Sequence, residues 1–322
     1  MENNILEVRN LKKYYPIKGN ILKKEKQYVK AVDDISFNIK KAETFAIVGE
    51  SGCGKSSLGK SIIRLIEPTE GQVILDGQDF TALKGKELKE AREKIKLIFQ
   101  DPYASLNPRM TVKDIIAEPL DIAKAYKNNE EREQMIIDIM NSVGLNLDYM
   151  GRYPHEFSGG QRQRIGIARA IALQPKLIIC DEPVSALDVS IQAKIINLLK
   201  ELQKKMGMAY IFISHDLSIV KHISDRVGVM YLGNMVEIAS KDSLFKEPLN
   251  PYTQALFSSI PKIGDGRIED KEILTGDVPS PANPPNGCCF HTRCKKAMDK
   301  CSKEKPILKE IRPGHLCACH LY

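Results

Sequence analysis

Eight consecutive residues near the start of the chain have the types and spacing that bind phosphate. They are Gly49-Glu50-Ser51-Gly52-Cys53-Gly54-Lys55-Ser56, which fit the pattern GxxxxGK[ST]. Glycines at these offsets let successive backbone N–H groups turn toward phosphate oxygens. The amine of Lys55 can reach the terminal phosphates, and the hydroxyl of Ser56 can ligate Mg²⁺. The run, extended by Ser57, therefore predicts a loop that binds a nucleotide and its magnesium ion.

The segments on either side of this loop have the patterns that a phosphate site requires. Thr44 to Val48 is a short apolar run typical of a buried strand, and Ser57 to Ile66 is typical of a helix. A loop that joins a strand to a helix places phosphate at the helix N-terminus. A chance glycine-rich turn would lack these flanks.

Further candidates for chemistry follow two later apolar runs. Leu177 to Cys180 is followed by Asp181 and Glu182, and Tyr210 to Ile213 is followed by Ser214 and His215. Asp181 can hold the Mg²⁺ shell, and Glu182 can orient and activate an attacking water. An Asp-Glu pair after a strand can also mark only a helix start, and a lone histidine is more often a packing residue. With a phosphate loop upstream, the pair predicts a hydrolytic site.

The positioning elements expected from the sequence alternate strands with helices. From Asp101 to about Gly151 this alternation stops at a proline-bearing loop and helical stretches, which include Glu131 to Val143. We expect an inserted helical subdomain there and an irregular basic stretch from Tyr14 to Lys30. Strands are expected at 6–9, 35–39, 44–48, 71–77, 95–99, 177–180, 210–213, 227–231 and 235–238.

The composition is ordinary for a soluble globular protein. Of the 322 residues, 43% are hydrophobic and 28% charged, and the formal net charge is +7. No apolar run reaches the ~18 residues of a membrane span, and residues 1–7 do not resemble a signal peptide. We therefore expect a cytoplasmic location. The cluster at 23–26 is expected to be a solvated loop, and no nucleic-acid partner is expected.

The cysteines are concentrated at one end of the chain. Six of the eight fall in residues 288–319, after a proline- and glycine-rich stretch at 261–287 that reads as a linker. In a cytoplasmic protein such crowding favours metal binding over disulfides.

A run between the phosphate loop and the acidic pair carries a family resemblance. Phe157-Ser158-Gly159-Gly160-Gln161-Arg162-Gln163-Arg164 resembles the signature sequence of ABC ATPases. In the same family pattern Gln100 matches the Q-loop glutamine, Ser185-Ala186-Leu187-Asp188 the D-loop, and His215 the switch histidine. These motifs, in the family's order, cover residues 6–240.

The resemblance implies a P-loop NTPase (ABC ATPase) core of α/β class, with an antiparallel β subdomain, the helical insertion and a Cys-rich C-terminal extension. It implies an ABC ATPase domain at 1–260 with its helical subdomain at about 101–170, the linker at 261–287 and a metal-binding module at 288–322. The cofactors implied are ATP and Mg²⁺.

Roles for single residues also follow from the resemblance. Two ATP-binding chains are expected to close head to tail, so that Ser158, Gly159, Gly160, Gln161 and Asp188 contact ATP bound to the partner's loop. The implied catalytic residues are Lys55, Gln100, Glu182 and His215, and the implied Mg²⁺ ligands are Ser56, Gln100 and Asp181. Apart from the resemblance, an aromatic side chain in the stretch from Tyr14 to Lys30 could stack on the base. Tyr15 is the preferred residue, with Tyr14 and Tyr28 as competitors, and an ordinary packed or surface tyrosine is the alternative.

Three stretches narrow the resemblance to peptide importers. Residues 100–110, 250–256 and 287–320 are similar to the extended Q-loop, the segment after the core and the tail of dipeptide and oligopeptide importers, in their F-type ATP-binding subunit. This implies ATP-driven peptide import at the cytoplasmic face of the plasma membrane, with two transmembrane permeases, a sister ATPase or second copy, and an extracytoplasmic peptide-binding protein. Nickel or another small solute is the nearest alternative. More distant ones are a soluble ABC ATPase and an iron–sulfur protein with a vestigial ATPase.

The subfamily pattern selects four cysteines of the tail. Cys288, Cys294, Cys301 and Cys319 are implied to hold a [4Fe-4S] cluster. Their spacing, C-x5-C-x6-C-x17-C, is not that of a zinc finger. Structural Zn²⁺ and metal-free thiols stay open, and a metal there would serve as a staple for a short tail.

Overall fold

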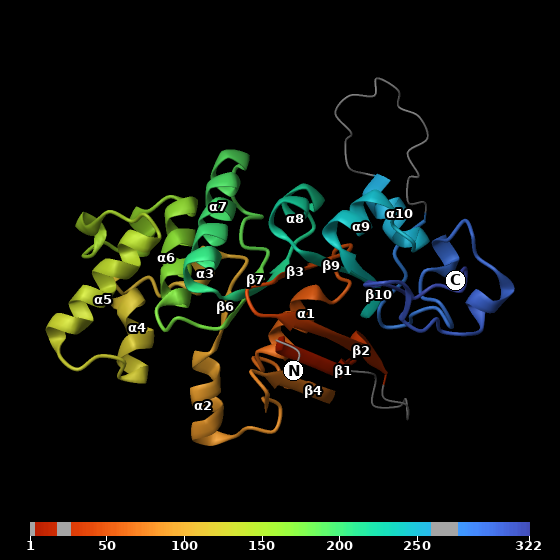
Figure 1. Cartoon of the computed structure of the whole chain (residues 1–322), viewed down its shortest axis with the longest axis horizontal. Coiled ribbons are helices and arrows are strands. Elements are labelled where there is room, and N and C mark those ends of the chain that lie inside the picture. Colours follow the sequence, from red (N-terminus) through yellow and green to blue (C-terminus); the bar gives the residue numbers. More distant parts are fainter. Residues whose placement is uncertain (1–3, 18–26, 259–275) are drawn as a thin grey trace. The chain divides into compact units, whose positions relative to one another are not determined.

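The computed structural model describes residues 4–17, 27–258 and 276–322 of an α/β protein (Figure 1). The charged cluster at 23–26 and the linker up to residue 275 lie outside the described residues. The chain divides into two compact units. The first unit comprises Met1–Leu6, Ile39–Glu43 and Leu75–Ile213, and the second comprises Glu7–Asn38, Thr44–Ile74 and Ser214–Tyr322.

The first unit contains three parallel strands with β7 in the centre. Their bounds are β6 (Ile95–Ile98), β7 (Leu177–Asp181) and β8 (Ala209–Ile213). In register, Leu97 lies opposite Ile179, and Ile179 opposite Ile211. Every residue of β7 and β8 is buried, which explains why both read as continuous apolar runs rather than alternating ones. The unit also contains β5 (Gln78–Asp79), α2 (Gly85–Glu93) and α7 (Val189–Met206).

Helices separate β6 from β7, which confirms the predicted interruption of the alternation. They are α3 (Pro102–Ser105), α4 (Val112–Ala123), α5 (Asn129–Ser142) and α6 (Gly159–Ile171), with 3-10 turns at Leu147–Tyr149 and Pro154–Glu156. Figure 1 shows α4, α5 and α6 side by side, and each contacts the other two. Ile116, Leu120, Ile136 and Met140 are fully buried between them. The apolar faces of these helices therefore position the start of α6.

The second unit contains most of the residues of three strands that pair in the order β2-β1-β4. Their bounds are β1 (Asn4–Pro16), β2 (Tyr28–Lys40) and β4 (Glu70–Leu75). The irregular stretch expected from Tyr14 to Lys30 is wrong at both ends, because β1 continues to Pro16 and β2 starts at Tyr28. Polar partners support the extended backbone: Lys12 pairs with Glu70 at 2.6 Å, and the Tyr14 N–H donates to the Thr69 hydroxyl at 2.9 Å. Residues 14–16 and 28–30 are therefore strand residues, and residues 18–26 lie outside the described ranges.

The tail residues after 276 join the other sheet of the second unit. The strands β3 (Thr44–Val48), β9 (Arg226–Tyr231), β10 (Asn234–Ser240), β12 (His315–Cys317) and β11 (Lys309–Arg312) lie in this order. β3 and β9 are parallel, and the remaining pairs are antiparallel. The predicted closing hairpin is confirmed, with positive φ at Leu232 and Gly233. The helices are α1 (Lys55–Ile62), α8 (Leu217–Ile223), α9 (Lys241–Lys246) and α10 (Pro251–Ser258), with 3-10 turns at His291–Arg293 and Asp299–Ser302.

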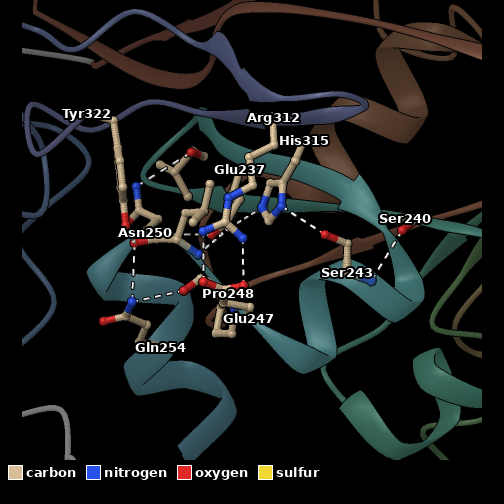
Figure 2. A network of polar contacts seen from close by, with 12 residues as sticks. Glu237, Ser240, Ser243, Glu247, Pro248, Asn250, Gln254, Arg312, His315 and Tyr322 are labelled. Atoms are coloured by element: carbon tan, nitrogen blue, oxygen red, sulfur yellow. Dashed lines mark hydrogen bonds and ion pairs between the residues drawn. The ribbon is translucent and has the colours of Figure 1, made fainter.

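A buried polar network attaches the tail to β10 (Figure 2). Glu237 is fully buried in β10, and its carboxylate lies 2.7 Å from Nε2 of His315 and accepts from the N–H groups of Leu249 and Asn250 at 2.7 and 3.0 Å. Nδ1 of His315 lies 3.0 Å from the Ser243 hydroxyl. A buried carboxylate needs this number of partners to offset its desolvation, so strand β12 and the start of α10 are fixed together.

None of the helices within the described ranges is long and apolar enough to cross a membrane.

Candidate functional site

The predicted phosphate loop joins β3 to α1 in the second unit. All five residues of β3 are buried, and α1 begins at Lys55 with Gly54 at its N-cap. Gly54 has φ 104°, and no side chain caps this helix start. The first backbone N–H groups of an α-helix have no intrahelical acceptor, so the start of α1 is suited to an anion.

Two glycines of the loop are required by close backbone approach. A Cβ on Gly49 would lie 2.2 Å from the Met230 carbonyl oxygen, and a Cβ on Gly54 would lie 1.9 Å from that of Ala31. Both contacts are far shorter than any real Cβ contact. The N–H of Gly233 also donates to the Cys53 carbonyl at 2.9 Å. The β9–β10 hairpin therefore packs against one side of the loop and constrains its backbone conformation.

The side chain of Lys55 lies along the loop rather than in solvent. Lys55 is 5% exposed, and its ammonium group donates to the carbonyl oxygens of Gly49 and Glu50 at 2.8 and 3.0 Å. A buried ammonium held by backbone carbonyls is a positive charge placed where the loop can bind phosphate.

Glu50 is held by two residues that the sequence did not suggest. Its N–H donates to the Tyr252 hydroxyl at 2.9 Å, and its carboxylate accepts two hydrogen bonds from Arg293, at 2.8 and 3.1 Å. The hydrogen bond to Glu50 raises the pKa of the Arg293 guanidinium, and burial raises that of the Tyr252 hydroxyl. Tyr252 and Arg293 stand in the segments 250–256 and 287–320, which were singled out only for their family resemblance.

Of the three tyrosines considered for base stacking, Tyr15 lies beside α1. Its hydroxyl is 3.5 Å from that of Ser57, and the Lys13 ammonium lies 5.0 Å from its ring centroid. The Tyr14 hydroxyl donates to Asp33, and Tyr28 is 41% exposed. This geometry agrees with the preference for Tyr15, and its stacking on a base stays a prediction.

The predicted hydrolytic residues stand at strand ends in the first unit. Asp181 ends β7 and is 4% exposed. Glu182 has φ 47°, a conformation that costs free energy for a residue with a side chain, and its N–H donates to the Ile213 carbonyl at 3.1 Å. Nε2 of Gln100 donates to its carboxylate at 2.9 Å. The structure thus brings Gln100 and Glu182 together at the ends of β6 and β7.

The signature run forms the start of α6. Ser158 is the N-cap, with its hydroxyl accepting from the Gln161 N–H at 3.4 Å while the Gln161 side chain accepts from the Ser158 N–H at 3.0 Å. This capping box fixes the helix start. A Cβ on Gly160 would lie 2.5 Å from Cγ2 of Ile191 in α7, so glycine permits the two helices to approach.

The D-loop residues lie next to this helix start. A Cβ on Gly159 would be 3.1 Å from Cδ2 of Leu187. Asp188 caps α7 by accepting from the Ile191 N–H at 3.0 Å, and a hydrogen bond from Ser190 lowers the pKa of its carboxyl group. The signature and D-loop runs therefore form one packed surface of the first unit.

The extended Q-loop is attached to the same helix by two arginines: Arg162, whose contact the sequence did not reveal, and Arg169, which was not among the predicted residues. Arg169 in α6 donates to the Ser105 carbonyl at 2.8 Å, and the Arg162 guanidinium lies 5.1 Å from the Tyr103 ring centroid. Tyr103 itself is 58% exposed. A displacement of the Q-loop would therefore be transmitted to α6, the helix that begins in the signature run.

His215 lies in the second unit, directly before Asp216, the N-cap of α8. It is exposed, and its γ-phosphate role stays a prediction.

The cysteines of the tail lie close enough to influence one another. Burial, and then nearby Cys301, Cys289 and Cys319, raise the pKa of Cys288 to about 11. Burial, and then nearby Cys294 and Cys301, also raise the pKa of Cys319. A thiol with such a pKa stays protonated at neutral pH unless a metal displaces the proton. Across residues 4–17, 27–258 and 276–322, no group of three or more His, Cys, Asp or Glu side chains is arranged to hold a metal ion.

Comparison with protein families gives two matches. The family described as "ABC transporter" matches residues 32–185, and that described as "Oligopeptide/dipeptide transporter, C-terminal region" matches residues 236–301. The oligopeptide transport ATP-binding protein AppF of Bacillus subtilis (strain 168) is 55% identical, over 100% of this chain and 98% of its own length. The putative oligopeptide transport ATP-binding protein YkfD of the same organism is 54% identical, over 99% and 95%.

Solved structures with the same fold are also ATP-binding cassettes. CbiO1 from Clostridium perfringens, part of the ABC transporter complex CbiONQ, has a TM-score of 0.65 at 28% identity and covers 76% of this chain and 92% of its own. The cassette MJ0796, solved as a dimer in a post-hydrolysis state with ADP and Pi, has a TM-score of 0.64 at 30% identity and covers 73% and 98%.

Proposed function

We infer that this chain, which belongs to the ATP-binding proteins of the ABC transporter family and to their oligopeptide/dipeptide group, is an ATPase that powers peptide import. The observation that carries this conclusion is 55% identity to an oligopeptide transport ATP-binding protein along the full length of both chains. The match of residues 236–301 to the oligopeptide/dipeptide C-terminal region supports the peptide class of substrate independently of the core.

The phosphate loop and the strand ends supply the parts of an ATP hydrolysis site. The uncapped start of α1 and the buried Lys55 ammonium bind the phosphates. Mg²⁺ would be held by Ser56, Asp181 and Gln100, and it would neutralise charge on the phosphates. Glu182 acts as the base that orients the attacking water. The Gln100 amide, 2.9 Å away, fixes which way its carboxylate points.

A second ATP-binding chain completes the site. The start of α6 presents the N–H groups of Gly159 and Gly160 and the helix dipole, both favourable to a γ-phosphate. In the proposed head-to-tail pair, Ser158 to Gln161 and Asp188 contact ATP bound by the partner, which is a sister ATPase or a second copy of this chain. The dimeric form of MJ0796 supports such a pairing.

The remaining partners follow from peptide import. Two transmembrane permeases would carry the peptide, an extracytoplasmic binding protein would deliver it, and this chain would sit peripherally on the cytoplasmic face of the membrane. The exposed Tyr103, tied through Arg162 to α6, supports the extended Q-loop as the surface that meets a permease.

The substitution Glu182→Gln tests the hydrolytic assignment. We expect the variant to bind ATP, to lose turnover and to accumulate as the closed pair, because the amide cannot accept a proton from water. ATP binding and phosphate release by the purified protein measure the first two properties, and sedimentation in the presence of ATP measures the third. Hydrolysis at the wild-type rate would refute the assigned mechanism.

We also propose that Cys288, Cys294, Cys301 and Cys319 hold a [4Fe-4S] cluster, with Zn²⁺ as the alternative. The support for this proposal is the similarity of residues 287–320 to the tail of the importer subfamily, because the thiols of the described residues are not arranged around a metal position. Anaerobically purified protein is expected to be brown and to contain iron. If the protein contains zinc and no iron, the site is a structural zinc site rather than a cluster. If it contains neither metal, the four cysteines are metal-free thiols.

The domain organisation that we propose is an ATPase domain at 1–260, a linker at 261–287 and a Cys-rich module at 288–322. The position of α3 to α6 between residues 102 and 171 supports the inserted helical subdomain at about 101–170. Pairing of β12 with β10 indicates that the module is tied to the sheet rather than tethered loosely.

A further inference from the structure

We propose that Arg293, in the Cys-rich tail, is a positioning residue of the phosphate loop. Its guanidinium neutralises Glu50 and holds this residue in place. The tail would then be a working part of the ATP site, and not only an attachment for a metal. The proposal rests on the proposed function, because it concerns the same loop.

The ion pair between Arg293 and Glu50 has the geometry of a strong one. Two nitrogens of the guanidinium donate to the two carboxylate oxygens at 2.8 and 3.1 Å, and a third contact reaches the Tyr231 hydroxyl at 3.4 Å. The Arg293 side chain is 5% exposed and that of Glu50 is 21% exposed. Bidentate pairs shielded from water are stronger and less screened than surface pairs.

Aromatic packing holds Arg293 in this orientation. The rings of Tyr231 and Phe290 each lie 6.0 Å from its guanidinium carbon. Tyr231, Tyr252 and Phe290 pack on one another with ring centroids 4.6 to 5.4 Å apart. Because the Tyr252 hydroxyl accepts from the Glu50 N–H, this one cluster fixes both the backbone and the side chain of a single loop residue.

The negative charge of Glu50 links this contact to ATP binding. Glu50 directly follows Gly49, and an unpaired carboxylate in a phosphate-binding loop would repel the triphosphate. Arg293 cancels that charge from the side of the tail. Lysine would keep the charge but could not form the bidentate pair.

The experiment is calorimetric titration of the full-length chain with MgATP. Arg293→Ala is expected to raise the Kd about tenfold, the scale of one unpaired charge a few ångströms from the phosphates. Arg293→Lys is expected to raise it about threefold, since the charge remains. The double variant Arg293→Ala with Glu50→Gln is expected to return to within about twofold of the wild type, because its loop carries no unpaired carboxylate.

A second arginine of the tail is a matched control. Arg312 makes the same bidentate pair with Glu247, at 2.6 and 2.7 Å, but the side chains are 47% and 61% exposed and contact no part of the phosphate loop (Figure 2). Arg312→Ala is expected to leave the Kd for MgATP unchanged. Thermal unfolding of every variant separates lost affinity from lost fold.

The outcomes distinguish this proposal from the proposed function. A Kd of Arg293→Ala equal to that of the wild type would overturn the positioning role, and so would a loss of affinity that Glu50→Gln does not restore. If Arg293→Ala does not fold, the Arg293→Lys variant and the charge-free double variant decide in the same way. Failure of the wild-type chain itself to bind MgATP would contradict the proposed function instead.

Discussion

The starts of α1 and α6 are both assigned to ATP, yet they are built in opposite ways. Gly54 at the start of α1 offers no side-chain cap, whereas Ser158 at the start of α6 is locked by its reciprocal bonds to Gln161. An uncapped start leaves its N–H groups to an anion at all times. A capped start is stable without a ligand, so it can remain folded until ATP bound to another chain reaches it. The difference fits a loop that binds ATP first and a signature helix that recognises it afterwards.

The largest expected effect comes from adding a methyl group at Gly54, the N-cap residue of α1. Gly54→Ala would place a methyl group 1.9 Å from the Ala31 carbonyl oxygen, so the loop must move. We expect a loss of ATP affinity of at least about 100-fold, measured by titration with MgATP. At Gly52, φ is 76° but no atom lies within 4 Å of an added Cβ. Gly52→Ala should therefore cost only the ~1 kcal/mol of a left-handed conformation, which corresponds to a loss of ATP affinity of about fivefold. Equal effects would show that steric room at Gly54 is not what shapes the loop.

A smaller effect is expected where α6 meets α7. Gly160→Ala places a methyl group 2.5 Å from Cγ2 of Ile191, a branched side chain with little rotational freedom. Overpacking of this kind costs about 1–3 kcal/mol and should lower the urea midpoint of unfolding. In the same helix, Gly166 has nothing within 4 Å of an added Cβ, so Gly166→Ala should stabilise by about 0.5–1 kcal/mol. A Gly160→Ala variant as stable as Gly166→Ala would remove the packing reason for glycine in the signature.

The smallest effect expected is loss of the cap itself. Ser158→Ala should destabilise α6 by about 1 kcal/mol, seen as a shift in the same unfolding curve. Ser158→Asp keeps a side-chain oxygen for the Gln161 N–H and should retain stability. Its negative charge should nevertheless oppose the γ-phosphate of the partner's ATP and weaken ATP-dependent pairing, measured by sedimentation. Normal pairing of Ser158→Asp would mean that the signature helix start does not meet phosphate.

Local patterns predicted the phosphate loop, the closing hairpin and the helical insertion, because each depends on residues close together in sequence. A strand end likewise led to Glu182, and the family resemblance led to Gln100. The structure joins these two residues by a hydrogen bond. The pair of Glu50 and Arg293 is separated by 243 positions and leaves no periodic trace. A charged residue within a buried strand is a signal that could have predicted the contact between β10 and the tail. Glu237 interrupts the apolar run of a buried strand, and a buried carboxylate requires a partner such as His315.

The measurement that tests the central claim most directly is peptide uptake by the complete transporter in sealed vesicles loaded with ATP. Transporter containing the wild-type chain should accumulate a labelled oligopeptide only when ATP is present. Transporter with Glu182→Gln in this chain should bind ATP but accumulate no peptide. Uptake by that variant at the wild-type rate would contradict the claim that ATP hydrolysis at this carboxylate powers peptide import.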